Sequence, residues 1–531
     1  MNMNSPQAVL LATGLALLVG CTPPSSREAA KEQAPVSYSS TYRPPYFVEK
    51  ERLGQIGEAL AGVHHYYEKS AAANHLPGIA YGVVVDDSLL LFGGSGTINL
   101  KSGAPVTRYS LFRIASMSKS FTAMAILKLR DEGLLALSDP AQKYLPELEH
   151  LTYLTADAAP LTIFNLLTMT AGFPEDNPWG DRFLDISDDA LLEQVKEGIP
   201  FSTLPSLHYE YSNLGYGLLG QIIRQVSGMP YQEYITANIL HPLGMTQTIW
   251  EYSEAPANLL ALGYRWEDQS WKSEALLHDG AFGAMGGLIT SIEDFSKYIS
   301  LHLSAWPPRS DGEEGPVKRS TLREMHRMNK PGFYSSATRF GNTASPLMRA
   351  YGFGLVSMLD QEGILEVGHN GGLPGFGSSY TFYPDYGIGI MAFSNLTYVG
   401  GAVQTANYRV IEKLIDEGLF VPRTMPPSEI LLERKEQLTQ LLLHWAPSLE
   451  EEIVAANLYL DISRDKRMEE ARQLLKLTGE IVEIGPVIPE NQLRGTYIIY
   501  GSGRALKVYF TLSPESKPRV QWLTLELLPE K

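Results

Sequence analysis

The sequence is poor in cysteine and in positive charge. Cys21 is the only cysteine among the 531 residues, so the chain cannot form an internal disulfide bond or supply a cysteine-rich zinc site. Its 43 Lys and Arg are outnumbered by 59 Asp and Glu, and the formal charge of −16 argues against nucleic acid as a partner. Hydrophobic residues still make up 44% of the chain, which excludes disorder over most of its length.

The N-terminal region predicts an exported protein. Residues 8–20 form an apolar run that is shorter than the roughly 20 residues needed to span a membrane, but that suits a secretory signal. The run ends in Leu-Val-Gly before Cys21, which resembles a bacterial lipobox, whose cysteine carries two acyl chains and anchors the protein stably. We therefore expect a lipoprotein signal peptide over 1–20 and a lipid anchor at Cys21.

This interpretation places the protein in the bacterial cell envelope, facing the periplasm. Thr22, rather than Asp, follows the lipobox cysteine and favours the outer membrane by analogy with other lipoproteins. Residues 1–7 contain no Lys or Arg, which departs from the usual signal sequence. An uncleaved short anchor and a secreted protein with a buried cysteine are therefore alternatives.

Composition divides the rest of the chain into four segments. Prolines scattered among Ser, Ala and Glu predict a flexible tether over 21–45. A long mixed region, 46–420, follows, and the Pro-rich residues 421–427 separate it from a C-terminal α+β domain of unknown role at 428–531.

Hairpin patterns lie near both ends of the 46–420 region. A helix is expected over 47–74, before strands at 79–85 and 89–92, and a second strand pair is expected at 379–383 and 388–393. Strands at both ends of a helix-rich middle predict one α/β (α+β) domain, whose sheet combines N-terminal and C-terminal segments.

The C-terminal segment predicts helices followed by a β-meander. The helices are expected over 428–445 and 449–477, the second opening with Ser448 and Glu451 at the spacing of a capping box. Three strands are expected at 496–500, 506–512 and 520–527.

Ser116 and Lys119 form the first motif that indicates chemistry. They lie at the start of an apolar helix that is expected to run to about Asp131, and a separation of three residues puts both side chains on one helix face. A serine hydroxyl needs a base to become a nucleophile, and free lysine, with a pKa near 10.4, is protonated at neutral pH. Burial or nearby cations must lower the pKa of Lys119 before it can act as that base.

Two further motifs follow in an informative order. Tyr211 and Asn213 form Y-x-N, and His369 with Gly371 forms H-x-G. With Ser116 and Lys119 this set resembles the serine β-lactamase and penicillin-binding-protein superfamily, specifically its class C-like branch. The segments 161–172, 238–245 and 284–288 also resemble that superfamily, and the resemblance covers roughly 55–415.

The resemblance implies a fold and a reaction. The fold is an antiparallel sheet flanked by helices, with an all-helical subdomain, and the active site lies between them. Ser116 would attack a carbonyl and form an acyl-enzyme, with Lys119 and Tyr211 as a coupled acid–base pair and without metal or cofactor. The implied substrate-binding positions are Asn213, which contacts substrate or orients Lys119, His369, Gly371 and Gly372. The backbone N–H groups of Ser116 and Gly372 would form the oxyanion hole.

His369 departs from the pattern of members that recognise β-lactams, which usually have lysine there. Histidine is mostly neutral at pH 7, so the sequence favours small esters or peptide-like amides over carboxylate-bearing β-lactams. A D,D-peptidase or D-aminopeptidase acting on cell-wall peptides is an alternative. A catalytically idle ligand-binding protein of the same fold is another.

Two other features have bland interpretations. Residues 215–220 match the G-x-G-x-x-G dinucleotide fingerprint, but no βαβ pattern surrounds them, so we interpret them as a closely packed helix and expect no cofactor. Trp179 either lines the mouth of the pocket or anchors its own loop.

Overall fold

The computed structural model describes residues 37–337, 339–340 and 345–529. Cys21, the expected signal peptide and most of the expected tether lie outside these residues. Within them, no helix combines the length and the apolarity that crossing a membrane requires.

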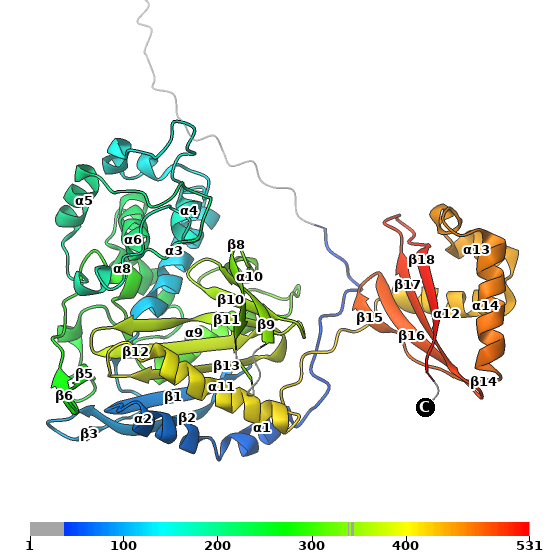
Figure 1. Cartoon of the computed structure of the whole chain (residues 1–531), viewed down its shortest axis with the longest axis horizontal. Coiled ribbons are helices and arrows are strands. Elements are labelled where there is room, and N and C mark those ends of the chain that lie inside the picture. Colours follow the sequence, from blue (N-terminus) through cyan, green and yellow to red (C-terminus); the bar gives the residue numbers. More distant parts are fainter. Residues whose placement is uncertain (1–36, 338, 341–344, 530–531) are drawn as a thin grey trace, which may run out of the picture. The chain divides into compact units, whose positions relative to one another are not determined.

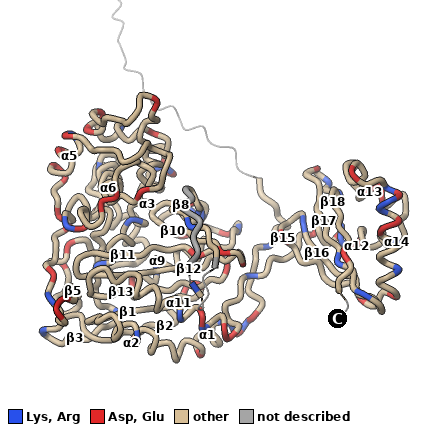
Figure 2. The backbone as a smooth tube through the Cα atoms, in the orientation of Figure 1, with Lys and Arg blue, Asp and Glu red and all other residues tan. Residues whose placement is uncertain are grey.

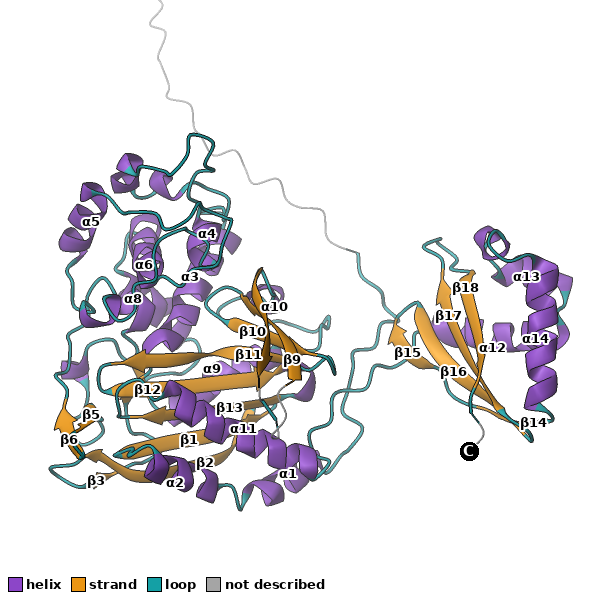
Figure 3. Cartoon of the chain, viewed as in Figure 1, coloured by secondary structure: helices purple, strands orange, loops and turns teal. Residues whose placement is uncertain are grey.

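A large antiparallel sheet organises the first part of the chain (Figures 1 and 3). In the described residues nine strands follow the order β3-β2-β1-β13-β12-β11-β10-β9-β8. β1 pairs with β13 in a register that sets Ile79 opposite Ser394, which confirms the prediction of a sheet built from both ends of the domain. The strands are β1 (Gly78–Val85), β2 (Ser88–Asn99), β3 (Ala104–Pro105), β8 (Lys330–Ala337), β9 (Ser345–Tyr351), β10 (Val356–Asp360), β11 (Leu365–Leu373), β12 (Phe376–Tyr383) and β13 (Ile388–Ser394).

Helices cover both faces of the sheet. Successive β1 side chains alternate between two apolar cores, so Tyr81 packs in one and Ala80 in the other. One core contains residues of α1 (Arg52–Leu60), α2 (His64–Ala73) and α11 (Gly400–Asp416), and the other contains residues of α9 (Ile292–Ser304). The single helix expected over 47–74 is wrong, because the chain turns at 61–63, where Gly62 is a poor helix former, and α1 and α2 are separate.

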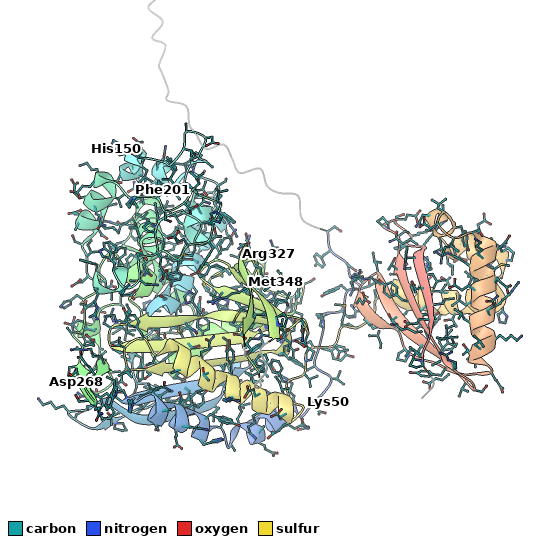
Figure 4. The ribbon with its side chains drawn as sticks, in the orientation of Figure 1. Lys50, His150, Phe201, Asp268, Arg327 and Met348 are labelled. Carbon is teal, nitrogen blue, oxygen red and sulfur yellow. The ribbon has the colours of Figure 1, made fainter. Side chains whose placement is uncertain are left out.

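A helical subdomain lies beside one end of the sheet, where His150 and Phe201 are labelled (Figure 4). The glycines of the 215–220 motif lie on α6 (Asn213–Ser227), where a Cβ at Gly217 would fall 2.7 Å from Phe282 and one at Gly220 would fall 2.7 Å from Ala284. The motif therefore packs α6 closely against α8 (Gly283–Gly286). Other helices are α3 (Lys119–Asp131), α4 (Ile163–Leu167), α5 (Asp188–Glu197), α7 (Tyr231–Ile235) and α10 (Arg319–Met325). Short strands are β4 (Phe112–Arg113), β5 (Tyr264–Glu267), β6 (Ser270–Ser273) and β7 (Ile289–Thr290).

The C-terminal segment forms a small sheet domain with its own apolar core. The three expected strands correspond to β16, β17 and β18, and two short strands, β14 and β15, join them. The helix expected over 449–477 is wrong, because the chain leaves the helix at Val454, which bridges Val520. The first piece begins at Pro447, so the expected cap at Ser448 is also wrong. The elements are α12 (Glu429–His444), α13 (Pro447–Ile453), α14 (Arg464–Thr478), β14 (Ile481–Ile484), β15 (Ile488–Asn491), β16 (Arg494–Gly501), β17 (Ala505–Leu512) and β18 (Val520–Leu527).

Charged residues of both signs are distributed along the chain (Figure 2). Acidic residues outnumber basic ones over the whole sequence, 59 to 43.

Candidate active site

Ser116 lies on a strained turn between the sheet and the helical subdomain. The expected helix does not start at Ser116: residues Ala115–Ser118 form a 3₁₀ turn, and α3 begins at Lys119. Ala115, directly before Ser116, has φ +52°, a left-handed conformation that costs a residue with a side chain roughly 1–3 kcal/mol. Ser118 holds the turn, since its hydroxyl donates to Ala115 O (2.7 Å) and accepts from the N–H of Leu288 (3.1 Å).

Lys119 is completely buried against Ser116. Its Nζ donates to Ser116 Oγ (3.0 Å), Asn213 Oδ1 (2.7 Å) and Met285 O (2.9 Å). Burial lowers the pKa of Lys119 to about 7, although the carboxylates of Asp181 and Asp176 oppose this shift. Near neutral pH, Lys119 therefore exists in both protonation states. A pKa lowered in this way is what Lys119 needs in order to act as a base.

Tyr211 completes the group around the serine. Its phenol is hydrogen-bonded to Ser116, and its ring centroid lies 4.9 Å from Lys119 Nζ. Burial raises the pKa of Tyr211 well above its usual value of 10, more than the hydrogen bond to Ser116 lowers it. Tyr211 is therefore a neutral phenol at pH 7, which makes it a proton donor, while Lys119 is the better proton acceptor.

Asn213 orients Lys119. It is the first residue of α6, its Oδ1 accepts from Lys119, and its Nδ2 donates to the side chain of Asn177. Asp176 accepts the backbone N–H groups of Asn213 and Leu214, both at 2.7 Å, and so caps the start of α6. Of the two roles expected for Asn213, its contacts here are those of the positioning role.

The third motif lies on β11, whose edge approaches the serine turn closely. A Cβ at Gly371 would fall 2.3 Å from Ile114 O, and one at Gly372 would fall 2.9 Å from the ring of Tyr398. Neither position accommodates a side chain without displacing its neighbour. The glycines thus keep the backbone of β11 against the serine turn.

His369 is a buried neutral imidazole. Its Nδ1 lies 2.5 Å from Asn370 O, which can only accept, so Nδ1 carries the proton and Nε2 accepts from Tyr351 Oη (3.2 Å). Burial and the charges of Lys119 and Arg349 lower the pKa of His369 to about 3. The imidazole is therefore uncharged at pH 7.

A cavity of about 340 Å³ opens above Ser116. Its wall includes Asp181 and Tyr398, which share a hydrogen bond from Tyr398 Oη to Asp181 Oδ2 (3.1 Å) and which no motif spacing indicated. Within the described part of the chain, no Lys or Arg is among its lining residues. These are Ser116, Asn177, Asp181, Tyr211, His369, Asn370, Gly371, Gly372, Tyr398, Gly400 and Gly401.

Trp179 does not line this cavity. Its ring packs against Phe183 and Phe282, with centroid distances of 5.1 and 5.9 Å. It therefore anchors its loop.

A second cavity, of about 310 Å³, adjoins the first, because Tyr211, His369 and Asn370 line both. Arg349, on β9, lies on its wall, as does Arg339, which is paired with Asp360 and Glu366. A fixed cation thus stands near the third motif although position 369 is a histidine, because the charge of Arg349 reaches His369.

Among the residues that the structure describes, no group of three or more His, Cys, Asp or Glu is arranged to hold a metal ion. The polar groups around Ser116 are instead those of nucleophilic catalysis by a serine: a hydroxyl, a buried amine and a phenol.

Fold and site together define the class of serine β-lactamases and penicillin-binding proteins. The Beta-lactamase family profile matches residues 63–415, and the chain belongs to this family.

Curated relatives support the same assignment. The chain is 29% identical over 352 residues to Protein flp of Staphylococcus aureus (strain NCTC 8325 / PS 47), covering 65% of each protein. It is 27% identical over 314 residues to Penicillin-binding protein 4* of Bacillus subtilis (strain 168), covering 56% of this chain and 64% of the relative. The chain thus spans about 65% of the length of the curated relatives it matches.

A solved structure has a similar fold. The octameric penicillin-binding protein homologue from Pyrococcus abyssi matches with a TM-score of 0.55 and 20% identity, covering 88% of this chain and 100% of that one.

Proposed function

We propose that the protein is a class C-like serine hydrolase that forms an acyl-enzyme at Ser116. Neutral Lys119 takes the proton of Ser116 Oγ as Oγ bonds to the substrate carbonyl carbon. The negative charge on the carbonyl oxygen is stabilised by the backbone N–H groups of Ser116 and Gly372. The bond to the leaving group then breaks, and water releases the acyl group from Ser116 in a second addition and elimination.

The observation that carries this proposal is the contact between Lys119 and Ser116. Nζ lies 3.0 Å from Oγ, and the pKa of about 7 leaves much of the amine unprotonated at neutral pH. Tyr211 supplies the acid, because its raised pKa keeps a proton on Oη for the leaving group. The proton held by Lys119 then restores the phenol, so no net proton is lost during acylation.

The favoured substrates are small esters or peptide-like amides. A neutral His369 offers no charge to a substrate carboxylate, which sets it apart from the lysine of β-lactam-recognising members. A D,D-peptidase or D-aminopeptidase that acts on cell-wall peptides is the second candidate. Arg349 supports the D,D-peptidase, since its positive charge on the wall of the adjoining cavity attracts a carboxylate on the leaving part.

Labelling tests whether the protein is a hydrolase or an idle binding protein. A fluorophosphonate probe is expected to form one adduct, mapped by mass spectrometry to Ser116, and Ser116→Ala is expected to remove both the adduct and 4-nitrophenyl acetate turnover. Ser102→Ala is the matched control, because Ser102 is exposed, lies in the turn between β2 and β3, and is not among the residues that line the cavity. No adduct in the wild type, or turnover that survives Ser116→Ala, would contradict the proposal.

We also propose that the protein is held in the cell envelope by a lipid on Cys21. Support comes from the apolar run at 8–20 and the lipobox-like residues before Cys21. Cys21→Ser is expected to move the protein from the membrane fraction to the soluble fraction. Membrane association that persists in this variant would rule the anchor out.

A further inference from the structure

Asp181 is a buried carboxylate on the wall of the catalytic cavity. It is 2% exposed, and among the described residues the recorded hydrogen bond to it is the one from Tyr398. Burial raises the pKa of Asp181, while Lys119, Tyr398 and Arg182 oppose the shift. A carboxylate removed from water is costly unless a cation or several donors compensate for its charge.

The cations near Asp181 are engaged elsewhere. Lys119 donates to Ser116, Asn213 and Met285. Lys119 must also be neutral before it takes the proton of Ser116, so it carries no charge in the form of the site that receives the substrate. Arg182 has a side chain that is 54% exposed and pairs with Glu274 at 3.5 Å. Arg113, which lines a small cavity with Asp181, donates to Gly287 O and Leu277 O. The reactive form of the site is therefore short of one positive charge beside Asp181.

The position of Asp181 in the cavity indicates which part of a bound substrate lies next to it. The leaving group must face Tyr211, the proton donor, which lines both cavities, and from Tyr211 the second cavity continues past His369. Asp181 lines the catalytic cavity but is not among the lining residues of the second, and it lies beside Tyr398, whose ring lies against Gly372 on the oxyanion side. The part of the substrate near Asp181 is therefore the acyl part, the one that becomes attached to Ser116.

We propose that Asp181 binds an ammonium group on the acyl part of the substrate, so that the preferred substrates are aminoacyl esters or amides. This inference rests on the proposed acyl-enzyme mechanism. An ammonium supplies the missing charge, donates to Asp181, and lies beside the aromatic face of Tyr398, which attracts cations. The absence of Lys and Arg from the described lining residues leaves no charge there to repel it.

The test compares substrates that differ by one charge. The 4-nitrophenyl esters of glycine, D-alanine and L-alanine are assayed with their N-acetyl forms, with spontaneous hydrolysis subtracted. The wild type is expected to have a kcat/KM at least tenfold higher for the free ammonium form of one or more of these pairs. Asp181→Asn is expected to reduce that ratio by roughly tenfold or more, the scale of losing one partner of a buried charge pair.

Two variants separate this effect from a change in Lys119. Because Lys119 serves every substrate, its altered pKa in Asp181→Asn changes both members of a pair and leaves their ratio alone. Asp185→Asn removes an exposed carboxylate four residues away, and the ratio is expected to stay at the wild-type value. Tyr398→Phe removes the hydrogen bond but keeps the charge of Asp181, and the ammonium preference is expected to persist.

The wild type alone provides a second measurement if Asp181→Asn fails to fold. Alaninamide is expected to inhibit ester turnover competitively at lower concentration than N-acetylalaninamide. Equal kcat/KM for both members of every pair, or a ratio unchanged in Asp181→Asn, would overturn the inference and leave the hydrolase intact. If no ester is turned over and no probe labels Ser116, the proposed function fails, and the inference fails with it.

Discussion

Asn213 Oδ1 lies 2.7 Å from Lys119 Nζ, where the first residue of α6 meets the first residue of α3. An amide oxygen accepts a hydrogen bond from both the neutral amine and the ammonium, so it fixes the position of Nζ without forcing either protonation state. The amine therefore stays beside Ser116 before and after it takes the proton.

The rate of acylation is expected to follow the titration of Lys119. Because the base must be unprotonated and its pKa is about 7, kcat/KM for 4-nitrophenyl acetate should fall as the pH drops below about 7. Well below this pKa the fall approaches tenfold per pH unit. The measurement is a pH profile of kcat/KM from pH 5 to 9. A profile that stays flat down to pH 5 would exclude Lys119 as the base.

Asn213→Asp is expected to move this profile to higher pH. A carboxylate 2.7 Å from Nζ stabilises the ammonium, so the pKa of Lys119 rises and activity at pH 7 falls, but it recovers at higher pH. The recovery distinguishes this effect from misfolding. A variant that loses activity equally at all pH values would contradict the positioning role of Asn213.

Tyr211→Phe is expected to affect substrates according to their leaving groups. In the proposed mechanism the phenol donates a proton to the leaving group, which an anilide needs and 4-nitrophenolate does not. The kcat for a 4-nitroanilide should therefore fall by roughly 100-fold or more, and the acylation rate with the nitrophenyl ester by much less. Burst kinetics separates acylation from deacylation. Equal losses in acylation for both substrates would indicate that Tyr211 is not the acid.

Arg349→Gln tests the D,D-peptidase alternative. If Arg349 binds a carboxylate on the leaving part, the variant should raise KM for a peptide that ends in D-Ala-D-Ala, with little effect on the matching peptide amide. The measurement is the rate at which the wild type and Arg349→Gln release D-alanine from the peptide acid and D-alaninamide from the peptide amide. An equal change in KM for acid and amide would place Arg349 outside substrate recognition.

Acid is expected to destabilise the fold through a buried histidine pair. Trp306 Nε1 donates to His326 Nδ1 (3.0 Å), so Nε2 of His326 carries its proton and donates to His302 Nδ1 (2.8 Å). Both imidazoles are neutral, and burial lowers the pKa of His302 to about 3 and that of His326 well below its usual value.

The unfolded chain therefore binds more protons than the folded chain below pH 6.5. The free energy of unfolding should fall by about 1.4 kcal/mol per pH unit for each histidine between pH 6.5 and the lowered pKa. Urea unfolding at several pH values from 7.5 to 5 measures the slope. His302→Gln keeps an acceptor for His326 and should reduce the slope, while His150→Gln, an exposed control labelled in Figure 4, should not. An unchanged slope in His302→Gln would disprove the prediction.

Local patterns predicted the strands that carry strong turn signals. The hairpins at 79–92 and 379–393 correspond to β1–β2 and β12–β13, because Asp, Ser, Pro and Gly between apolar runs define the turns. The helix expected over 449–477 was wrong because a long-range bridge, Val454 with Val520, draws the chain out of the helix. No window of neighbouring residues contains that bridge.

The candidate site likewise contains residues that the sequence predicted and residues that it did not. Ser116, Lys119, Tyr211 and His369 stand in motifs whose spacing is visible in the sequence, and the structure brings them together around one cavity. Asp181 and Arg349 stand in no recognisable pattern. They reach the site because folding brings Asp181 to the hydroxyl of Tyr398, and because β9 lies two strands from β11.

The pairing of Ile79 with Ser394 sets the order in which the molecule can be completed. As the chain is synthesised, the edge of β1 that pairs with β13 stays unpaired until β13 has been made. Strand pairs so distant in sequence form slowly. Until β11 has been synthesised as well, the cavity beside Ser116 lacks the wall that Gly371 and Gly372 provide, so this site is among the last parts of the domain to be completed.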